Sequence, residues 1–244
     1  MEMDDRAGQN LEGKVALVTG ASKGIGRAIA LALAGAGMDL ALAARGGEAL
    51  AEVAATVEGM GRRCVATPTD IGSPAEVDRL VGQALSVLGR VDVLVNNAGV
   101  GAHGTVEQTT PEEWQRVLAT NLTGPYLCSR AVLPSMRGNG GGAIIIISSG
   151  AGRTGYAGMA AYCASKFGLR GFAEALAAEV SEAGIKVSTI YPGTTVTDFG
   201  GGPRPRRPGV KVLFPQDVAE AVLYLLRQSA HAWTQELTLW PFSE

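Results

Sequence analysis

The chain has few of the residues from which metal and disulfide sites are built. Its 244 residues include two histidines and three cysteines, and Cys64, Cys128 and Cys163 are scattered without metal-ligand spacing. We therefore expect no metal site, and three free thiols in a reducing, cytoplasmic compartment. Excess positive charge is lacking as well, because 21 Lys and Arg stand against 23 Asp and Glu. Nucleic acid is therefore not an expected partner.

Long apolar runs are also missing, and none approaches the roughly 20 residues that a helix needs to cross a bilayer, so no membrane association is expected. The first ten residues are acidic and polar, unlike a signal peptide, and we expect residues 1–10 to be flexible. With 46% apolar and 18% charged residues, segment 11–244 is expected to form a single domain with a large core. Glycine is abundant at 34 residues, which favours tight turns.

Short apolar runs alternate with helical patterns along the chain. This alternation predicts an α/β fold, a doubly wound parallel sheet of the Rossmann type with about seven strands and helices on both faces. The ligand crevice of such a sheet lies at the carboxyl ends of its strands. The expected strands are 14–18, 39–44, 64–67, 91–95, 143–147, 186–191 and 236–240, and the expected helices are 25–36, 48–58, 74–88, 111–136, 159–183 and 216–227, with capping boxes at Ser73 and Thr110.

Tyr162 and Lys166 are four residues apart in one predicted helix and therefore share a face. A free phenol has a pKa near ~10, and a neighbouring ammonium lowers it. A tyrosine tuned in this way can give or take a proton at an oxygen. Lowering the pKa by roughly three units requires about 4 kcal/mol, more than one lysine supplies, and an oxidised nicotinamide would serve as the second cation. Taken alone, the pair is equally compatible with two solvated surface residues.

A glycine-rich turn joins the first strand to the first helix. Segment 19–26 reads Thr-Gly-Ala-Ser-Lys-Gly-Ile-Gly. Such glycines let a pyrophosphate approach the backbone, and the helix N-terminus adds N–H groups and a partial positive charge. A purely structural turn is the alternative at this point.

Five motifs in order resemble those of the short-chain dehydrogenase/reductase family, over roughly residues 11–240. The glycine-rich turn matches the family's T-G-x-x-x-G-x-G fingerprint. It is followed by Asn-Asn-Ala-Gly at 96–99, by Asn121, by Ser149 thirteen residues before Tyr162, and by Pro-Gly at 192–193. The resemblance implies an oxidoreductase that moves a hydride between a nicotinamide cofactor and a carbonyl or secondary alcohol.

The resemblance also implies a role for each matching residue. Ser149 would hydrogen-bond the substrate oxygen, and Tyr162 would act as general acid or base. Lys166 would bind the nicotinamide ribose and lower the pKa of Tyr162, and Asn121 would hold a relay water. The expected cofactor contacts are Gly20, Ser22, Lys23, Gly24, Ile25, Gly26, Arg45, Asp70, Ile71, Asn97, Ala98, Gly99, Tyr162, Lys166, Pro192, Gly193, Thr195 and Thr197.

The choice of cofactor depends on the end of the second strand. An NAD enzyme usually has a carboxylate there, which binds the ribose 2′-hydroxyl. This chain has Ala44 followed by Arg45, and Asp39 lies at the other end of the strand. Since Arg45 and Lys23 both suit a 2′-phosphate, NADP(H) is the predicted cofactor.

The substrate remains open between a small free carbonyl or hydroxy compound and a 3-oxoacyl thioester. The C-terminal segment 236–241 lacks the D-G-G ending that is common among the family's ketoacyl reductases, which favours the first. A cofactor-binding protein without turnover is a further alternative, disfavoured because all four catalytic residues are present. Arg204, Arg206 and Arg207 alternate with prolines, and an anion-binding lid and a solvated loop are equally compatible with that pattern.

The helix at 159–183 carries small residues on the face opposite Tyr162. Because such a stripe lets another helix approach closely, it predicts a homo-oligomer, a tetramer by family resemblance with a dimer as the alternative. The stripe consists of Ala164, Gly168, Gly171, Ala175 and Ala178. We expect His103 to be an exposed loop residue, Cys163 a packed thiol, and Trp114, Trp233 and Trp240 packing residues.

Pro125 lies inside the predicted helix 111–136. Proline has no N–H to donate to the carbonyl of Asn121, four residues back, and its ring crowds that carbonyl. We expect a kink that leaves this carbonyl free for the relay water. A kink that only serves packing is equally compatible with the sequence.

Overall fold

The computed structural model describes residues 9–197, 199 and 211–242. Seven parallel strands form one sheet in the order β3-β2-β1-β4-β5-β6-β7, which confirms the predicted doubly wound fold. Residues 1–8 of the expected flexible terminus lie outside the described residues, as do Arg204, Arg206 and Arg207. The strands are β1 (Val15–Thr19), β2 (Asp39–Ala44), β3 (Cys64–Pro68), β4 (Val93–Asn96), β5 (Gly142–Ile147), β6 (Ile185–Pro192) and β7 (Glu236–Leu239).

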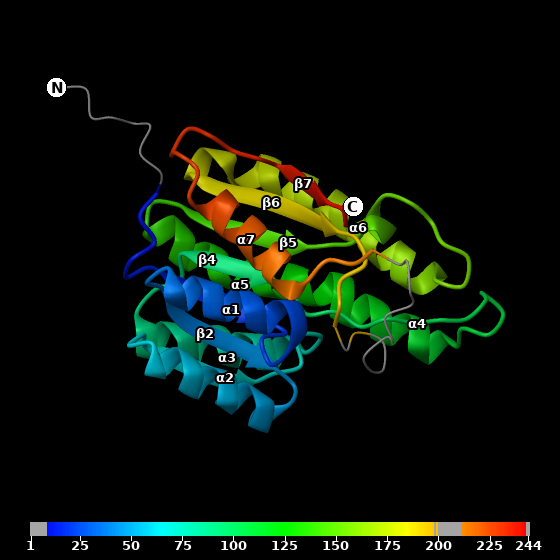
Figure 1. Cartoon of the computed structure of the whole chain (residues 1–244), viewed down its shortest axis with the longest axis horizontal. Coiled ribbons are helices and arrows are strands. Elements are labelled where there is room, and N and C mark those ends of the chain that lie inside the picture. The colour runs from blue at the N-terminus through cyan, green and yellow to red at the C-terminus, as the bar shows by residue number, and fades with distance from the viewer. Residues whose placement is uncertain (1–8, 198, 200–210, 243–244) are drawn as a thin grey trace.

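Helices cover both faces of the sheet (Figure 1). The core on one face is completed by α1, α2 and α7, and the core on the other by α3, α5 and α6. The helices are α1 (Gly24–Gly35), α2 (Gly47–Gly59), α3 (Pro74–Leu88), α4 (Pro111–Leu118), α5 (Gly124–Gly138), α6 (Ala160–Val180) and α7 (Pro215–Leu226).

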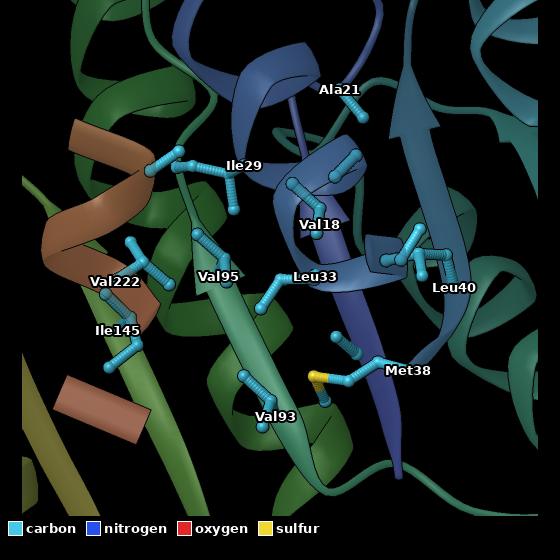
Figure 2. Packing of buried hydrophobic residues seen from close by; sticks show 14 of the residues in the cluster. Val18, Ala21, Ile29, Leu33, Met38, Leu40, Val93, Val95, Ile145 and Val222 are labelled. Carbon is cyan, nitrogen blue, oxygen red and sulfur yellow. The ribbon is translucent and has the colours of Figure 1, made fainter. Parts of the chain in front are cut away.

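The central strands β1, β4 and β5 are apolar except at their ends, because both of their faces are covered. In β1, Val18 faces the core beneath α1, whereas Leu17 faces the opposite core, and both are fully buried. Figure 2 shows Leu33 of α1 packed between β1, β4 and Val222 of α7. Each such side chain contributes about 1.5–3 kcal/mol of burial free energy, so this core fixes the strand ends that carry the site.

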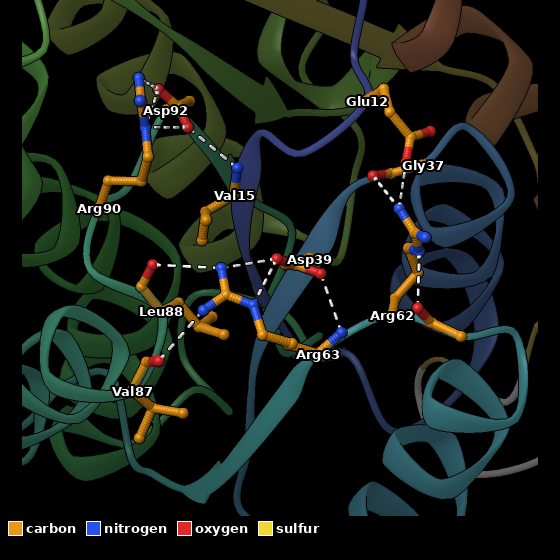
Figure 3. A network of polar contacts seen from close by, with 11 residues as sticks. Glu12, Val15, Gly37, Asp39, Arg62, Arg63, Val87, Leu88, Arg90 and Asp92 are labelled. Atoms are coloured by element: carbon orange, nitrogen blue, oxygen red, sulfur yellow. Dashed lines mark hydrogen bonds and ion pairs between the residues drawn. The ribbon is translucent and has the colours of Figure 1, made fainter.

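The amino ends of the strands are held together by paired charges (Figure 3). The N–H of Val15 donates to Asp92 at 2.9 Å, and Arg90 pairs with the same carboxylate. At the start of β2, Asp39 accepts hydrogen bonds from the backbone N–H and the guanidinium of Arg63, both at 2.8 Å. Asp39 therefore binds Arg63 at the amino end of β2, opposite Ala44, as its position in the sequence predicted.

The predicted helix 111–136, which was expected to kink at Pro125, is divided into two α-helices in the structure. Helix α4 ends at Leu118, a π-helix spans Ala119–Thr123, and α5 begins at Gly124. The N–H of Gly124 bonds the carbonyl of Ala119, five residues back. Because Pro125 cannot donate the next α-helical bond, a wider turn is tolerated there.

Neither of the two predicted capping boxes is complete in the described structure. Thr110 caps α4 as expected by accepting from the N–H of Glu113 at 3.2 Å. Ser73 precedes α3, but its side chain makes no capping bond to that helix in the described structure. Glu76, its expected partner, instead accepts from the backbone N–H of Asp70 at 2.8 Å. The side chain of Glu76 therefore bonds the loop after β3 instead of completing the capping box.

All five residues of the small-residue stripe on α6 are exposed, so no described segment of the same chain covers this face of the helix. In the part of the chain that the structure describes, no helix combines the length and apolar character that crossing a membrane requires.

Candidate active site

A cleft of about 780 Å³ opens at the carboxyl ends of the strands. It lies where the strand order reverses between β1 and β4, the position at which doubly wound sheets bind ligands. All of the residues expected to contact the cofactor line it, from Gly20 in the first turn to Thr197 after β6, and so do Ser149, Tyr162 and Lys166. Asn121 is the exception among the predicted site residues, because it is fully buried beside the cleft and is not part of its lining.

The glycine-rich turn is closed by backbone contacts that leave no room for side chains. A Cβ on Gly26 would lie 2.1 Å from the carbonyl oxygen of Gly20, and a Cβ on Gly20 would lie 2.8 Å from the Cα of Ala98. Gly20 also has a φ of 67°, which favours glycine. Helix α1 begins at Gly24, and the side chain of its N-cap residue, Lys23, makes no capping bond to it. The first turn of α1 thus suits a pyrophosphate, and a dinucleotide fits this cradle.

Thr19 was not among the predicted site residues, yet it connects the two halves of the cleft. Its hydroxyl accepts from the N–H groups of Asn97 and Ala98, at 3.0 and 3.1 Å, and donates to the carbonyl of Val95 at 3.3 Å. In return the amide of Asn97 donates to the carbonyl of Thr19 at 2.9 Å. Thr19 is the first letter of the fingerprint at 19–26, and that was the signal available in the sequence.

Two cations stand at the end of β2 and in the first turn. Arg45 and Lys23 are both exposed and line the cleft, and neither has an ion-pair partner among the residues that the structure describes. At the end of β3, Asp70 folds back so that one carboxylate oxygen accepts from the N–H of Gly72 at 2.9 Å. Two cations and one carboxylate therefore line this part of the cleft.

Tyr162 and Lys166 lie on the inner face of α6, as their spacing predicted. Tyr162 is buried, with the Lys166 ammonium 5.8 Å from its ring centroid. Lys166 is buried as well, and it donates to the carbonyl of Ile147 at 3.0 Å. Burial disfavours its charged form and lowers the pKa of Lys166 to about 8. Ser149 follows the end of β5, where its hydroxyl accepts from the N–H of Ala151 at 3.2 Å.

Asn121 sits within the π-helix, and its side chain is fully engaged with protein. Its carbonyl oxygen accepts from the N–H of Val100 at 2.8 Å, while its amide donates to the carbonyl of Val100 at 2.9 Å and to Ser165 at 3.1 Å. The side chain therefore pins the loop after β4 to α6. Its expected role in holding a relay water stays a prediction.

The expectation for Trp240 was incomplete, because this residue lines the cleft and is 60% exposed. Tyr156 and Phe199, which had no predicted role, line the cleft with it. Trp233 is a packing residue as expected, and its indole N–H donates to the carbonyl of Val187 at 3.0 Å. His103 is exposed and Cys163 is buried, also as expected.

Known proteins are similar to this sequence over most of its length. The profile of a family described as short chain dehydrogenase matches residues 14–207. The 3-oxoacyl-[acyl-carrier-protein] reductase of Escherichia coli is 36% identical over 238 residues, which cover 93% of this chain and 95% of that enzyme. A glycine betaine reductase of Emericella nidulans is 37% identical over 242 residues, but the chain spans only 19% of that much longer protein.

Solved structures agree with the sequence relatives. A metagenomic short-chain oxidoreductase in complex with NADP has a TM-score of 0.85 at 36% identity, over 96% of this chain and 100% of that one. A short chain dehydrogenase from Mycobacterium paratuberculosis bound to NAD has a TM-score of 0.86 at 31% identity, over 95% and 97% of the two chains. On this evidence the chain belongs to the short-chain dehydrogenase/reductase family of oxidoreductases.

Proposed function

We propose that the protein is an NADP(H)-dependent oxidoreductase that interconverts a small free carbonyl compound and the corresponding alcohol. The observation that carries the proposal is the convergence of Ser149, Tyr162 and a buried Lys166 on one cleft with the glycine-rich turn. The nicotinamide, when bound, supplies or accepts the hydride. The protein's own task is then to orient the carbonyl and to move one proton at its oxygen.

Each of the three side chains has a part in that task. The hydroxyl of Tyr162 donates its proton to the substrate oxygen in reduction and takes it back in oxidation. Ser149 donates a hydrogen bond to the same oxygen and so stabilises the charge that develops there. The ammonium of Lys166, 5.8 Å from the Tyr162 ring, favours the phenolate that remains after proton transfer.

A second candidate is the reduction of a 3-oxoacyl thioester, which the E. coli relative's name favours. The chain's ending at 236–241, without the D-G-G sequence, favours a free carbonyl substrate instead. Comparing a 3-oxoacyl thioester with free ketones of the same chain length separates the two. The non-catalytic alternative predicts cofactor binding without turnover of either.

The first prediction tests turnover. Incubation with NADPH and a panel of aldehydes and ketones should consume NADPH, followed by its absorbance. Tyr162→Phe should lower kcat by about 10²–10⁴-fold, because the general acid is lost, while NADPH binding is retained. Tyr224→Phe, a change at a 56% exposed tyrosine on α7, is the matched control and should keep wild-type activity. Full activity of Tyr162→Phe would contradict the assignment.

The NADP(H) preference rests on charge, since the solved relatives include both an NADP and an NAD complex. Arg45 offers a planar guanidinium with several donors at the end of β2, and Lys23 adds a second cation from the first turn. A 2′-phosphate would neutralise both cations, whereas an uncharged ribose hydroxyl would neutralise neither.

Arg45→Ala should therefore lower kcat/KM for NADPH by about 10–100-fold, the usual effect of losing a hydrogen bond to a charged group. The value for NADH should change much less, because NADH lacks the phosphate. Arg27→Ala, on the exposed side of α1 and outside the cleft lining, should change neither. Wild-type kcat/KM with NADH that equals or exceeds the value with NADPH would overturn the preference.

Burial of the Lys166 ammonium lowers the stability of the fold by an amount that depends on pH. Between its folded pKa of about 8 and the usual value of 10.5, the unfolded chain holds a proton that the folded chain lacks. Stability therefore rises with pH across this window, and the full penalty of burying the charge is present below pH 8.

Lys166→Met should consequently gain stability relative to the wild type at pH 7, and the gain should shrink by roughly 3 kcal/mol as the pH approaches 10.5. Thermal unfolding of the cofactor-free proteins at several pH values measures this difference. Lys211→Met, at an exposed lysine, is the control. A stability difference that is constant with pH would refute the lowered pKa.

We also propose that copies of this chain associate through the small-residue stripe on α6, as a tetramer or a dimer. Gly171 lies in this stripe, and a Cβ added there would meet nothing within 4 Å. Gly171→Glu should therefore leave the folded chain intact but shift sedimentation toward the monomer. Gly82→Glu is the control, because Gly82 on α3 is equally open. A wild-type monomer at micromolar concentration would end this proposal.

A further inference from the structure

The cleft is divided by charge. Its described lining includes Lys23, Arg45 and Asp70, all from the half built on β1, β2 and β3. In the half built on β5, β6 and β7, the lining from segments 147–151, 192–197 and Trp240 carries no ionisable side chain within the described structure. The lysine of the site, Lys166, is buried beneath the end of β5 and bonded to Ile147. A substrate beside Ser149 would lie in this half, against described segments that carry no charge other than that of Lys166.

Trp240 is seated in this half by two glycines. It follows β7, which pairs with β6, and the N–H of Gly193 bonds the carbonyl of Leu239 at 2.8 Å. A Cβ on Gly193 would lie 2.9 Å from Cε3 of Trp240, and a Cβ on Gly150 would lie 3.2 Å from its Cη2. The six-membered ring of the indole therefore rests against two stretches of backbone, and 60% of the residue is still exposed.

Other aromatic rings line the same cleft. The hydroxyl of Tyr156 would lie 3.6 Å from a Cβ on Gly150, and the ring of Phe199 is 5.8 Å from that of Tyr162. Tyr156 is 44% and Phe199 37% exposed. The chain has only three Trp, five Tyr and five Phe, yet four of these residues line this one cleft. Partly exposed rings grouped beside a reacting centre are characteristic of sites that bind apolar or aromatic groups.

We infer that Trp240 and Tyr156 form a platform for an aromatic ring attached to the reacting carbonyl, so that the substrate is an uncharged aryl ketone or aldehyde, or the corresponding alcohol. The inference rests on the proposed function and names its substrate class. Both side chains approach Gly150, which directly follows Ser149 in the chain. A ring bound on the platform would therefore lie close to the Ser149 hydroxyl, which orients the carbonyl. A stacked or edge-to-face ring pair adds affinity beyond its buried area, by about 2–12-fold.

The test compares two ketones of similar size, acetophenone and cyclohexyl methyl ketone, which differ in the aromaticity of the ring. The wild type should prefer acetophenone in kcat/KM by about 3–10-fold. Trp240→Ala should abolish that preference through a higher KM for acetophenone. Trp240→Phe should retain most of the preference. Trp114→Phe, at a residue on α4 outside the cleft lining, should behave as the wild type.

A binding measurement separates this inference from the proposed function. Saturation-transfer NMR on the cofactor-free protein should show the acetophenone ring protons in contact with the wild type and lose that signal in Trp240→Ala. Equal kcat/KM for the two ketones, or an aryl preference that survives Trp240→Ala, would overturn the platform while the oxidoreductase function stands. Faster turnover of the carboxylated analogue, benzoylformate, would overturn the uncharged substrate. Absence of turnover with every carbonyl, with the NMR contact intact, would instead refute the proposed function.

Discussion

The approach of the glycine-rich turn to the end of β4 is the contact on which the rest of the site depends. Gly20, Gly26 and Ala98 come so close that no side chain fits between them. The hydroxyl of Thr19 and the amide of Asn97 then join β1 to the segment after β4 by reciprocal hydrogen bonds. Because this contact lies where the strand order reverses, it places the N-terminus of α1 and the loop after β4 around one cleft.

The charged residues at the amino ends of the strands are arranged differently from those at the carboxyl ends. At the amino edge, Asp39 and Asp92 are matched by Arg63 and Arg90, so this edge presents satisfied ion pairs (Figure 3). Pairs of this kind, with a nearly buried carboxylate bonded to backbone N–H groups, favour one strand register. At the carboxyl edge, Arg45 and the first turn of α1 offer positive charge that the described chain does not itself neutralise. Lys23 and Arg45, which have no ion-pair partner among the described residues, thus lie where an anionic ligand could bind.

The sequence predicted what depends on local order and missed what depends on how distant segments meet. Strands, helices and most cleft residues could be predicted because motif residues follow strand ends, and parallel strands bring those ends together. The role of Trp240 could not, because it depends on β7 pairing beside β6 and on the space above Gly150 and Gly193. The π-helix around Asn121 was missed for a similar reason. Pro125 forbids one bond, but only the packed structure decides that a five-residue turn replaces it.

Lys166 shows how such a site trades stability for chemistry. In the described structure the carbonyl of Ile147 is the acceptor bonded to its ammonium, and burial brings the pKa of this lysine to about 8. Lys166 is therefore mostly charged at neutral pH, but its pKa lies only slightly above that pH. Hydroxyl groups brought by a ribose would add acceptors for the ammonium, and each added hydrogen bond favours the charged form. The influence of Lys166 on Tyr162 should accordingly strengthen when a cofactor binds.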